Sequence, residues 1–475
     1  MDRRTFLQYG IGATALGILG PTAPTASAQS NPAATKYRGQ TVRFLTVRNV
    51  HQLALADAMA EIAKGWGIDL QTRFITTDQL QKKVVVDFTG GADTWDLVYC
   101  GGIQRMYEWF DGGVISDIAP LIKSVGDQKF LEWDKFTPAA QKAVQFGNYT
   151  LGLTVGTSDQ AMSYRRDLFE HPEEKTAFKA KYGYDLQAPQ TYAQYRDAAE
   201  FFTRKKGQKL AGKPLSKDFY GLVLSNKKGT FLWHKTMNLF MAFGVDLYDP
   251  KTGKPGVDSP QAIQAAKFYH SLLPFLPEAH INMSSGEEAE MFAAGGAALT
   301  IEYFDRLLNA NEKVGEGLTP GSFAYTLPPS VPGAPHGRKN AFRSGPPVVS
   351  MFGRARNPEA AYKLLEAAVS SERQMAMTRA HPGYHPSKEP AMKALIQREP
   401  VVGYLLQAAS PSVSAMTDVD VMPYPGILVA SKIGDVVSEA MAAILIGAAP
   451  ETELAKAQAE LVAAYKELKP ARPQK

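Results

Sequence analysis

From residue 41 onward, the chain alternates between short apolar runs and longer amphipathic stretches. The runs at residues 41–47, 69–75 and 95–100 are bounded by polar or glycine-rich segments, which is typical of buried strands. Residues 53–64 and 78–88 lie between them and carry apolar side chains at helical spacing. This order of strand, helix, strand, helix and strand predicts a mostly parallel sheet with helices on its faces.

The second half of the chain continues the alternation with clear helix-start signals. Apolar runs predict strands at residues 298–303, 323–327 and 348–352. Apolar stripes over residues 433–444 and 454–464 predict two helices at the end of the chain. Each helix-start signal is a capping residue with a proline or a capping-box partner. The pairs are Thr191 with Gln194, Ser259 with Pro260, and Asn357 with Pro358.

The N-terminal segment has the order of parts that an export signal needs. Arg3 and Arg4 give a charged start, and residues 9–20 form an apolar stretch that is too short to span a bilayer. Ala26-Ser27-Ala28 then offers the small residues that signal peptidase reads. We therefore expect residues 1–28 to be a signal peptide. The alternative is an N-terminal helix that stays on the protein.

The paired arginines, followed by Phe6 and Leu7, resemble the twin-arginine export motif. A lipoprotein would need a cysteine at the cleavage point, and none is there. We therefore expect a protein that diffuses in the periplasm without a lipid anchor. Residues 29–40 are rich in Pro and Ala, and we expect them to form a flexible leader.

Composition and charge are those of an ordinary globular protein, with 45% hydrophobic and 21% charged residues. The formal net charge is +5, but Lys and Arg are scattered in short clusters such as residues 204–206. A nucleic-acid binder would concentrate this charge on one face, so we expect no nucleic-acid partner. Cys100 is the only cysteine, which excludes a disulfide within the chain. We interpret it as a buried small hydrophobic residue at a strand end.

The sequence lacks the common catalytic motifs G-x-S-x-G, H-E-x-x-H and the Walker-type phosphate loop. Lys251-Thr252-Gly253 matches one part of the penicillin-binding signature, but it lies in a turn and the S-D-N part is missing. His381 and His385 flank a Pro-Gly loop rather than a helix face that could bind a metal. We therefore expect no catalytic residue, metal or cofactor. An exported hydrolase of an unrecognised family remains a minor alternative.

Ordered motifs over nearly the whole chain resemble those of one protein family. The motifs are TVRFLTV from Thr41, WDLVYC from Trp95, GGVISDIAPLI from Gly112, YRRDLF from Tyr164, FAAGGAAL from Phe292, NPEAA from Asn357 and HPSK from His385. Each motif is weak alone, but their order makes the chain similar to extracellular solute-binding proteins of the maltose-binding-protein type. The resemblance implies capture of a small carbohydrate or polyol, delivery to the permease subunits of an ABC importer, and a monomer.

The resemblance also implies an α/β fold of the two-lobed, type II periplasmic-binding-protein class. The ligand cleft would lie between lobes that are joined by crossing strands, near residues 155–163, 325–328 and 377–384. The N-terminal lobe would comprise residues 41–155 plus 327–376. The C-terminal lobe would comprise residues 156–326 plus 377–475.

Candidate ligand-binding residues follow from the chemistry of sugar recognition and from the family's pattern. Aromatic faces stack on sugar rings, and polar side chains or backbone N–H groups satisfy the hydroxyls. In doubly wound sheets such residues lie in loops at the carboxyl ends of strands. The resemblance implies ten candidates: Arg48, Asn49, Gly101, Gly102, Thr157, Asp159, Trp233, Tyr303, Gly345 and Tyr384.

Several of these candidates have a plainer interpretation. Trp233 lies in an apolar stretch and could belong to the core. Gly101 and Gly102 could serve only to make a turn. The family often has Trp after Gly where this chain has Glu302-Tyr303, so the alignment could slip by a residue or two. Some relatives place a second stacking Trp near Gly434, and this chain has no aromatic residue there.

The charge of the ligand stays open at this point. Arg48, Arg105 and Arg343 could converge on an anionic ligand such as a uronate or a sugar phosphate, because a guanidinium group matches the geometry of carboxylate and phosphate. Three scattered surface arginines are the plainer interpretation. A polyamine or another cation is a further alternative.

Overall fold

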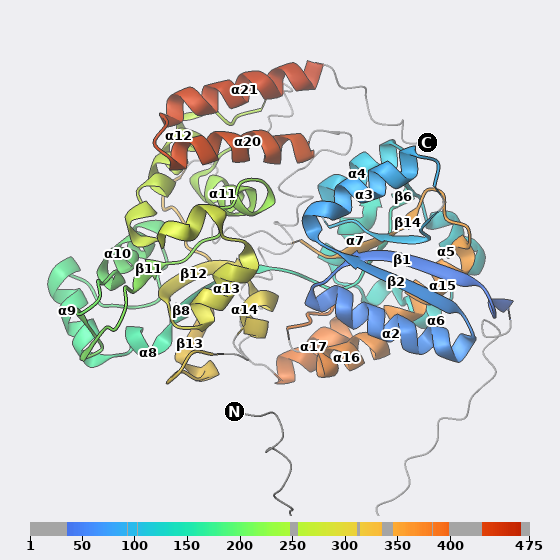
Figure 1. The fold of residues 1–475 in the computed structure, drawn as a ribbon, viewed down its shortest axis with the longest axis horizontal. Coiled ribbons are helices and arrows are strands. Elements are labelled where there is room, and N and C mark those ends of the chain that lie inside the picture. Colours follow the sequence, from blue (N-terminus) through green and yellow to red (C-terminus); the bar gives the residue numbers. More distant parts are fainter. Residues whose placement is uncertain are drawn as a thin grey trace, which may run out of the picture.

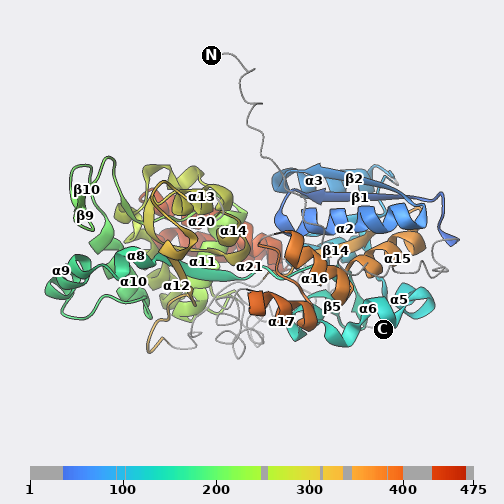
Figure 2. The same cartoon turned by 90° about the horizontal axis from the view of Figure 1, so that it is seen from below.

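The computed structural model describes residues 36–92, 94–101, 103–247, 255–310, 314–334, 345–381, 383–398 and 430–466. They form two α/β lobes, each built around its own main sheet and lying side by side along the long axis (Figures 1 and 2). Within this part of the chain, no helix combines the length and the apolar character that crossing a membrane requires. The expected signal peptide lies outside the described residues.

The sheet of the N-lobe follows the order β2-β1-β3-β14-β4, with β7 paired to β14. Its strands are β1 (Thr41–Val47), β2 (Asp69–Ile75), β3 (Leu97–Tyr99), β4 (Ile115–Ser116), β7 (Leu153–Thr154) and β14 (Val348–Phe352). β1 runs parallel to β2 and β3, as the alternation of strands and helices predicts. β14 comes from a much later part of the chain and runs antiparallel to β3, β4 and β7. β14 is therefore the one reversed strand among the described strands of this sheet. The others run in the same direction, which agrees with the predicted mostly parallel sheet.

Helices cover both faces of this sheet because successive side chains of β1 point in opposite directions. Val42 and Phe44 pack with one set of helices, and Leu45 and Val47 pack with the other. The first set is α2 (Val50–Trp66), α15 (Pro358–Ala368) and α16 (Ser371–Ala380). The second set is α3 (Thr77–Thr89), α4 (Ile103–Asp111) and α7 (Pro138–Val144). The remaining short elements are α5 (Ala119–Val125), α6 (Gln128–Leu131), η1 (Trp133–Lys135), β5 (Gln145–Phe146) and β6 (Tyr149–Thr150).

The sheet of the C-lobe follows the order β11-β12-β8-β13. Its strands are β8 (Gln160–Arg165), β11 (Tyr220–Leu222), β12 (Ala297–Tyr303) and β13 (Phe323–Thr326). β8 runs antiparallel to both neighbours, whereas β11 and β12 are parallel. Every residue of β12 is buried, so the groups at its end are held by a rigid core strand.

The other C-lobe elements surround this sheet. They are α8 (Arg166–Phe169), α9 (Pro172–Tyr182), α10 (Tyr192–Phe202), β9 (Lys209–Leu210), β10 (Lys213–Pro214), α11 (Thr230–Phe243), α12 (Pro260–His270), η2 (Leu273–Phe275), η3 (Glu278–Asn282), α13 (Ser285–Ala293), α14 (Phe304–Ala310) and η5 (Pro320–Ser322). The capping box of Thr191 and Gln194 is present at the start of α10, as predicted.

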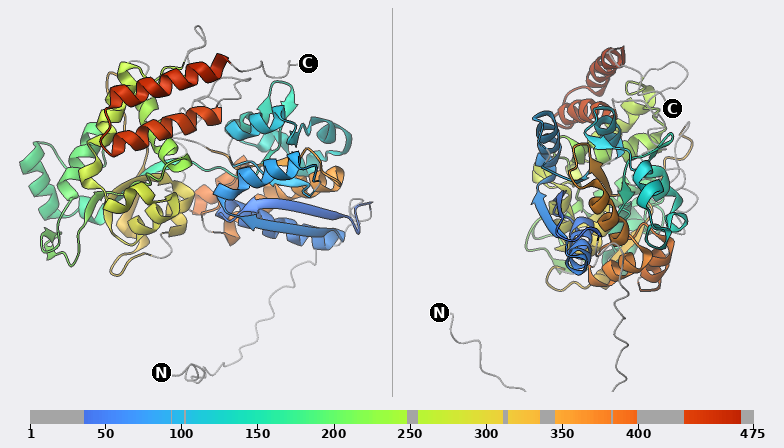
Figure 3. Two further views of the ribbon diagram at one scale, coloured as in Figure 1. Left: turned by 45° about the horizontal axis from the view of Figure 1, so that its top comes forward. Right: turned by 90° about the vertical axis from the view of Figure 1, so that its right-hand side faces the viewer.

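The two predicted C-terminal helices are confirmed as α20 (Ala430–Leu445) and α21 (Pro450–Lys466). Ile433, Val437 and Ile444 of α20 are buried, as are Leu454 and Leu461 of α21. Through these apolar stripes α20 packs on α11, and α21 packs on α12 and α20 (Figure 3). Both helices therefore belong to the C-lobe.

The chain passes between the two sheets at the β7–β8 junction and again between β13 and β14. A third passage follows α16, which packs on α2, and leads through α17 (Glu389–Arg398) toward α20. Met392 and Leu395 of α17 pack with Ala161 and Phe304 of the C-lobe. The exact lobe boundaries, residues 41–155 plus 327–376 and residues 156–326 plus 377–475, stay a prediction.

Candidate ligand site between the lobes

Two candidates follow β1 in the N-lobe and have defined partners. The Arg48 guanidinium is exposed and lies 5.0 Å from the centre of the Phe74 ring. The Asn49 side chain caps α2, because its Oδ1 accepts a hydrogen bond of 2.9 Å from the backbone N–H of Gln52. Asn49 thus has a structural role, and a contact with ligand stays a prediction for both residues.

In the loop after β3, Gly101 lies next to the side chain of Arg105. Gly101 has a φ of +73°, and a Cβ at this position would lie only 2.8 Å from Nη1 of Arg105. The turn therefore requires glycine both for its backbone conformation and for the space that the guanidinium occupies. Gly102 lies outside the described residues. Cys100 is buried as predicted, and burial raises the pKa of its thiol to about 12.

Thr157 and Tyr384 connect two of the chain passages. The Thr157 N–H donates to the carbonyl of His385 at 2.9 Å, and its hydroxyl donates to the carbonyl of Pro386 at 3.4 Å. The hydroxyl of Tyr384 is buried and donates to the carbonyl of Val155 at 2.9 Å. Both side chains thus hold the first passage against the third.

Gly345 and Asp159 also form hydrogen bonds at the chain passages, through their backbone groups. The Gly345 N–H donates to the carbonyl of Ser158 at 2.8 Å, which joins the second passage to the first. The carbonyl of Asp159 accepts a hydrogen bond of 2.8 Å from the N–H of Phe304, at the start of α14. The structure therefore brings four predicted site residues together where the lobes are joined. A contact between these residues and the ligand stays a prediction.

His51 is a residue of this region that sequence reasoning did not select. It is buried, and its Nε2 accepts a hydrogen bond of 3.4 Å from the His385 N–H. Its Nδ1 lies 3.9 Å from Oδ2 of Asp305, whose other oxygen accepts a bond of 2.8 Å from the Ser158 hydroxyl. Burial lowers the pKa of His51, although Asp305 opposes this effect. The imidazole therefore lies between the lobes as a neutral group near pH 7, and no sequence spacing links it to partners so far along the chain.

Trp233 lies in the core of the C-lobe. Its side chain is 4% exposed, and it packs with the apolar residues between α11 and α20. A Cβ at Gly434 would lie 3.1 Å from Cδ1 of Trp233, so the glycine of α20 leaves room for the indole. This environment favours the core interpretation over ligand stacking.

Tyr303, at the end of β12, is held between two other side chains. It is 3% exposed, and its hydroxyl lies 3.0 Å from Nδ1 of His234. The guanidinium of Arg306 lies 4.9 Å from the centre of its ring, a favourable cation–π arrangement. Arg306 is a further interlobe candidate that the sequence did not indicate.

A buried ionic cluster behind β12 positions Arg306. The ammonium of Lys235 donates to Glu288 at 3.0 Å, to Glu302 at 2.8 Å and to the carbonyl of Ile301. Nη1 of Arg306 then lies 3.7 Å from the other oxygen of Glu302. Although burial raises the pKa of Glu302, Lys235 and Arg306 outweigh it and keep that pKa low. Burial raises the pKa of Glu288 to about 8.

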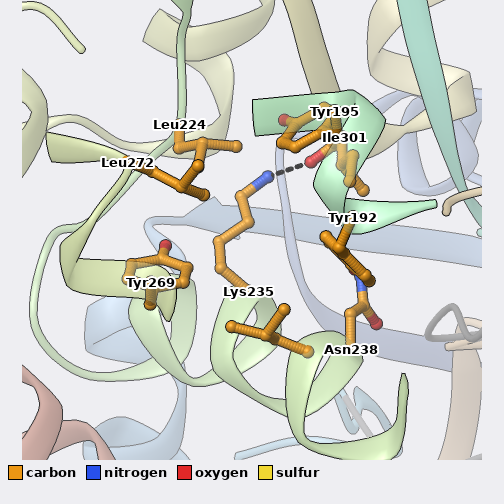
Figure 4. A pocket seen from close by; sticks show the side chains of 9 residues that line it. Tyr192, Tyr195, Leu224, Lys235, Asn238, Tyr269, Leu272 and Ile301 are labelled. Atoms are coloured by element: carbon orange, nitrogen blue, oxygen red, sulfur yellow. Dashed lines mark hydrogen bonds between the residues drawn. The ribbon is translucent and has the colours of Figure 1, made fainter. Parts of the chain in front are cut away.

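Lys235 also lines a small cavity inside the C-lobe (Figure 4). Its walls include Tyr192, Tyr195, Asn238 and Tyr269, which come from α10, α11 and α12. The cavity has room for about one water molecule, which is too little for a sugar. This cavity is therefore not the ligand site.

Arg105 and Asp435 bring opposite charges to the interlobe region from opposite lobes. Burial lowers the pKa of Arg105, whereas Asp435 on α20 acts to raise it. Burial raises the pKa of Asp435, and Arg105 acts to lower it. Tyr99, at the end of β3, influences the pKa of both Arg105 and Arg306. The end of β3 therefore lies near arginines of both lobes.

Two α/β lobes linked by repeated chain passages define the class of two-lobed periplasmic binding proteins. The family model described as bacterial extracellular solute-binding protein matches residues 54–375, which is more than half of the chain. The chain therefore belongs to this family, whose members are the substrate-binding proteins of transporters. Comparison with curated protein sequences gives no match.

Solved structures agree with this fold at low sequence identity. An ABC transporter solute-binding protein from Agrobacterium radiobacter K84, in complex with ribitol, has a TM-score of 0.72 and 20% identity, and covers 89% of this chain and 98% of its own. Maltose-bound MalE3 of Thermotoga maritima has a TM-score of 0.71, 18% identity and coverages of 89% and 99%. A solute-binding protein from Agrobacterium vitis S4, with bound D-mannitol, has a TM-score of 0.71, 19% identity and coverages of 90% and 99%.

Proposed function

We propose that this protein captures a small neutral carbohydrate or polyol between its lobes and delivers it to the permease subunits of an ABC importer. The observation that carries the proposal is the mixed charge of the interlobe region, where Arg105 and Arg306 lie near Asp435 and Asp305. A hydroxyl group both donates and accepts hydrogen bonds. A neutral polyhydroxy ligand can therefore satisfy guanidinium and carboxylate groups at the same time.

Proteins with the same fold hold ligands that range from polyols such as ribitol to oligosaccharides such as maltotriose. The Agrobacterium proteins hold ribitol and D-mannitol, and a solute-binding protein from Thermotoga lettingae holds alpha-D-tagatose. In this chain, the three aromatic candidates Trp233, Tyr303 and Tyr384 are only 4%, 3% and 0% exposed. Hydrogen bonding to a short polyol is thus better supported than stacking on a long oligosaccharide.

An anionic sugar derivative is the second candidate, because the Nε of Arg105 is buried without a hydrogen-bond partner among the described residues. The proposed convergence of three arginines has less support. Arg48 is exposed and stacks on Phe74, and Arg343 lies outside the described residues. Asp435 would also repel an anion bound at Arg105. We therefore rank the neutral ligand first.

A thermal-shift screen tests the proposal directly. A ligand at 100 times its Kd adds about 2.7 kcal/mol to the free energy of unfolding. The panel contains polyols and mono- and disaccharides, with uronates, sugar phosphates and polyamines as the competing classes. We expect stabilisation by a polyol or a small sugar. Stabilisation by a competing class alone would contradict the proposal, and chemical conversion of the ligand would favour the hydrolase alternative.

The cellular setting is part of the proposal. The family is extracellular, and we propose that the twin-arginine route takes this chain to the periplasm as an unanchored monomer. Replacing Arg3 and Arg4 with Lys should stop export, and the mature protein should begin at Gln29 by mass. Normal periplasmic levels of the double variant would mean that the general secretory route suffices.

A further inference from the structure

Arg105 and Asp435 face each other from opposite lobes. Arg105 lies on α4 of the N-lobe and Asp435 on α20 of the C-lobe, and these two helices are in contact (Figure 3). Each side chain favours the charged form of the other. Both residues are in the described part of the chain, and no ion pair joins them there. Their charges therefore act across a gap rather than through direct contact.

The guanidinium of Arg105 is held in place while its hydrogen-bonding capacity is only partly used. Its Nη1 makes one long contact of 3.5 Å with the carbonyl of Cys100, and its Nε is buried without a partner in the described part of the chain. At Gly101 the φ is +73°, and an added Cβ would come within 2.8 Å of Nη1, so the turn fits closely around this group. Burying a donor without a partner is unfavourable, and a ligand that satisfies the donor removes that penalty.

We propose that Arg105 and Asp435 determine the specificity of the interlobe site by binding neighbouring hydroxyl groups of one polyol or sugar molecule. This inference rests on the proposed function. The guanidinium donates to the hydroxyl oxygens, and the carboxylate accepts from the hydroxyl hydrogens. An anionic ligand is repelled by Asp435 and a cationic one by Arg105, so the pair selects a neutral molecule. Because the two residues belong to different lobes, the same ligand also links the lobes.

Binding measurements on matched variants test the inference. Titration calorimetry with ribitol and with D-mannitol compares the wild type with Arg105→Met, Arg105→Lys, Asp435→Asn and the double variant Arg105→Met/Asp435→Asn. Two controls change similar charges elsewhere: Glu439→Gln on α20, whose carboxylate pairs with Lys228 at 2.9 Å, and Arg354→Met, whose guanidinium lies 5.0 Å from the Phe88 ring centre. Melting temperatures of all variants verify that each one is folded.

We expect Arg105→Met and Asp435→Asn each to raise Kd at least tenfold, and both controls to keep it within twofold. The Kd of Arg105→Lys should lie between those of the wild type and Arg105→Met, because Lys keeps the charge but lacks the planar guanidinium group. The fold increase in Kd in the double variant should be smaller than the product of the two single increases, since both residues bind neighbouring hydroxyls of one molecule.

Three results would overturn the inference while the proposed function stands. These are unchanged polyol affinity in both folded single variants, full multiplicative loss in the double variant, and binding of a zwitterionic amino acid in preference to polyols through the same two residues. A wild-type protein that binds no polyol or small sugar overturns the proposed function, and this inference falls with it.

Discussion

Lys388 is a buried lysine whose ionisation should make the stability of this protein depend on alkaline pH. Its side chain is fully buried just before α17. The ammonium donates to the carbonyls of Phe130 at 3.1 Å and Leu131 at 2.7 Å and to the carboxylate of Glu132 at 3.2 Å. It also lies 4.7 Å from the centre of the Phe136 ring. Burial lowers the pKa of Lys388 from 10.5 to about 8, and Glu132 offsets only part of this effect.

The direction of the pH dependence is set by how many protons the folded and unfolded states bind. Between pH 8 and pH 10.5 the unfolded chain keeps a proton on Lys388 that the folded protein has released. Stability therefore rises with pH across this window, and it is lowered by a nearly constant amount below it. Burial of the charged Lys388 lowers the free energy of unfolding by ~3 kcal/mol at neutral pH, and about 2 kcal/mol of this loss is regained between roughly pH 8 and pH 10.

Urea unfolding of the wild type and of Lys388→Met at pH 8 and pH 10 isolates this contribution, because other titrating groups are common to both proteins. The stability of the wild type relative to the variant should increase by about 2 kcal/mol at the higher pH. The control Lys393→Met changes an exposed lysine of α17 and keeps Lys388, so its stability should differ from that of the wild type by the same amount at both pH values. A wild-type-to-variant difference that is equal at both pH values would refute the reasoning. It would mean that the Phe130 and Leu131 carbonyls keep the ammonium charged.

Three further predictions follow from the same structure. Trp233→Ala should lower the free energy of unfolding by about 3–5 kcal/mol with Kd unchanged in the folded fraction; a tenfold rise in Kd without destabilisation would restore its predicted stacking role. Gly156→Ala should destabilise the protein by about 1–3 kcal/mol in urea unfolding, because the added Cβ would lie 2.4 Å from Cδ2 of His51; a stability equal to the wild type would contradict this. The lowered pKa of His51 means that stability decreases as pH falls below 6.5, since the unfolded chain then binds the proton more readily. His51→Gln removes this imidazole but keeps Asp305 and Arg306, so its melting temperature should decrease less steeply at acid pH than that of the wild type.

Local patterns in the sequence were sufficient for the elements but not for every pairing. Helix caps and apolar periodicity act over a few residues, so α10, α20 and α21 could be predicted directly from the chain. The antiparallel insertion of β14 into the N-lobe sheet depends on a contact between segments far apart in sequence. No local pattern encodes the direction in which such a strand arrives.

The difference between local patterns and long-range contacts also explains which candidate site residues the sequence could indicate. The resemblance selected Thr157, Gly345 and Tyr384, and the structure brings them together at the chain passages, where their hydrogen bonds join backbone to backbone or side chain to backbone. His51 and Arg306 were missed because their roles come from partners on other elements rather than from a motif. Trp233 shows the reverse case, since an aromatic residue in an apolar helix is equally suited to the core and to a sugar-binding face.

The two places where the lobes meet differ in a way that bears on transport. At the chain passages, the lobes are joined by backbone hydrogen bonds, by the hydroxyls of Thr157 and Tyr384, and by the buried, neutral His51. Between α4 and α20, Arg105 and Asp435 bring opposite charges from separate lobes, and the Nε of Arg105 is buried without a hydrogen-bond partner among the described residues. A ligand can favour one arrangement of the lobes only through contacts that differ between arrangements. If the ligand binds as proposed, its recognition is coupled to the approach of the lobes on the α4–α20 side, near Arg306 at the end of β12. The chain passages would then act as the hinge.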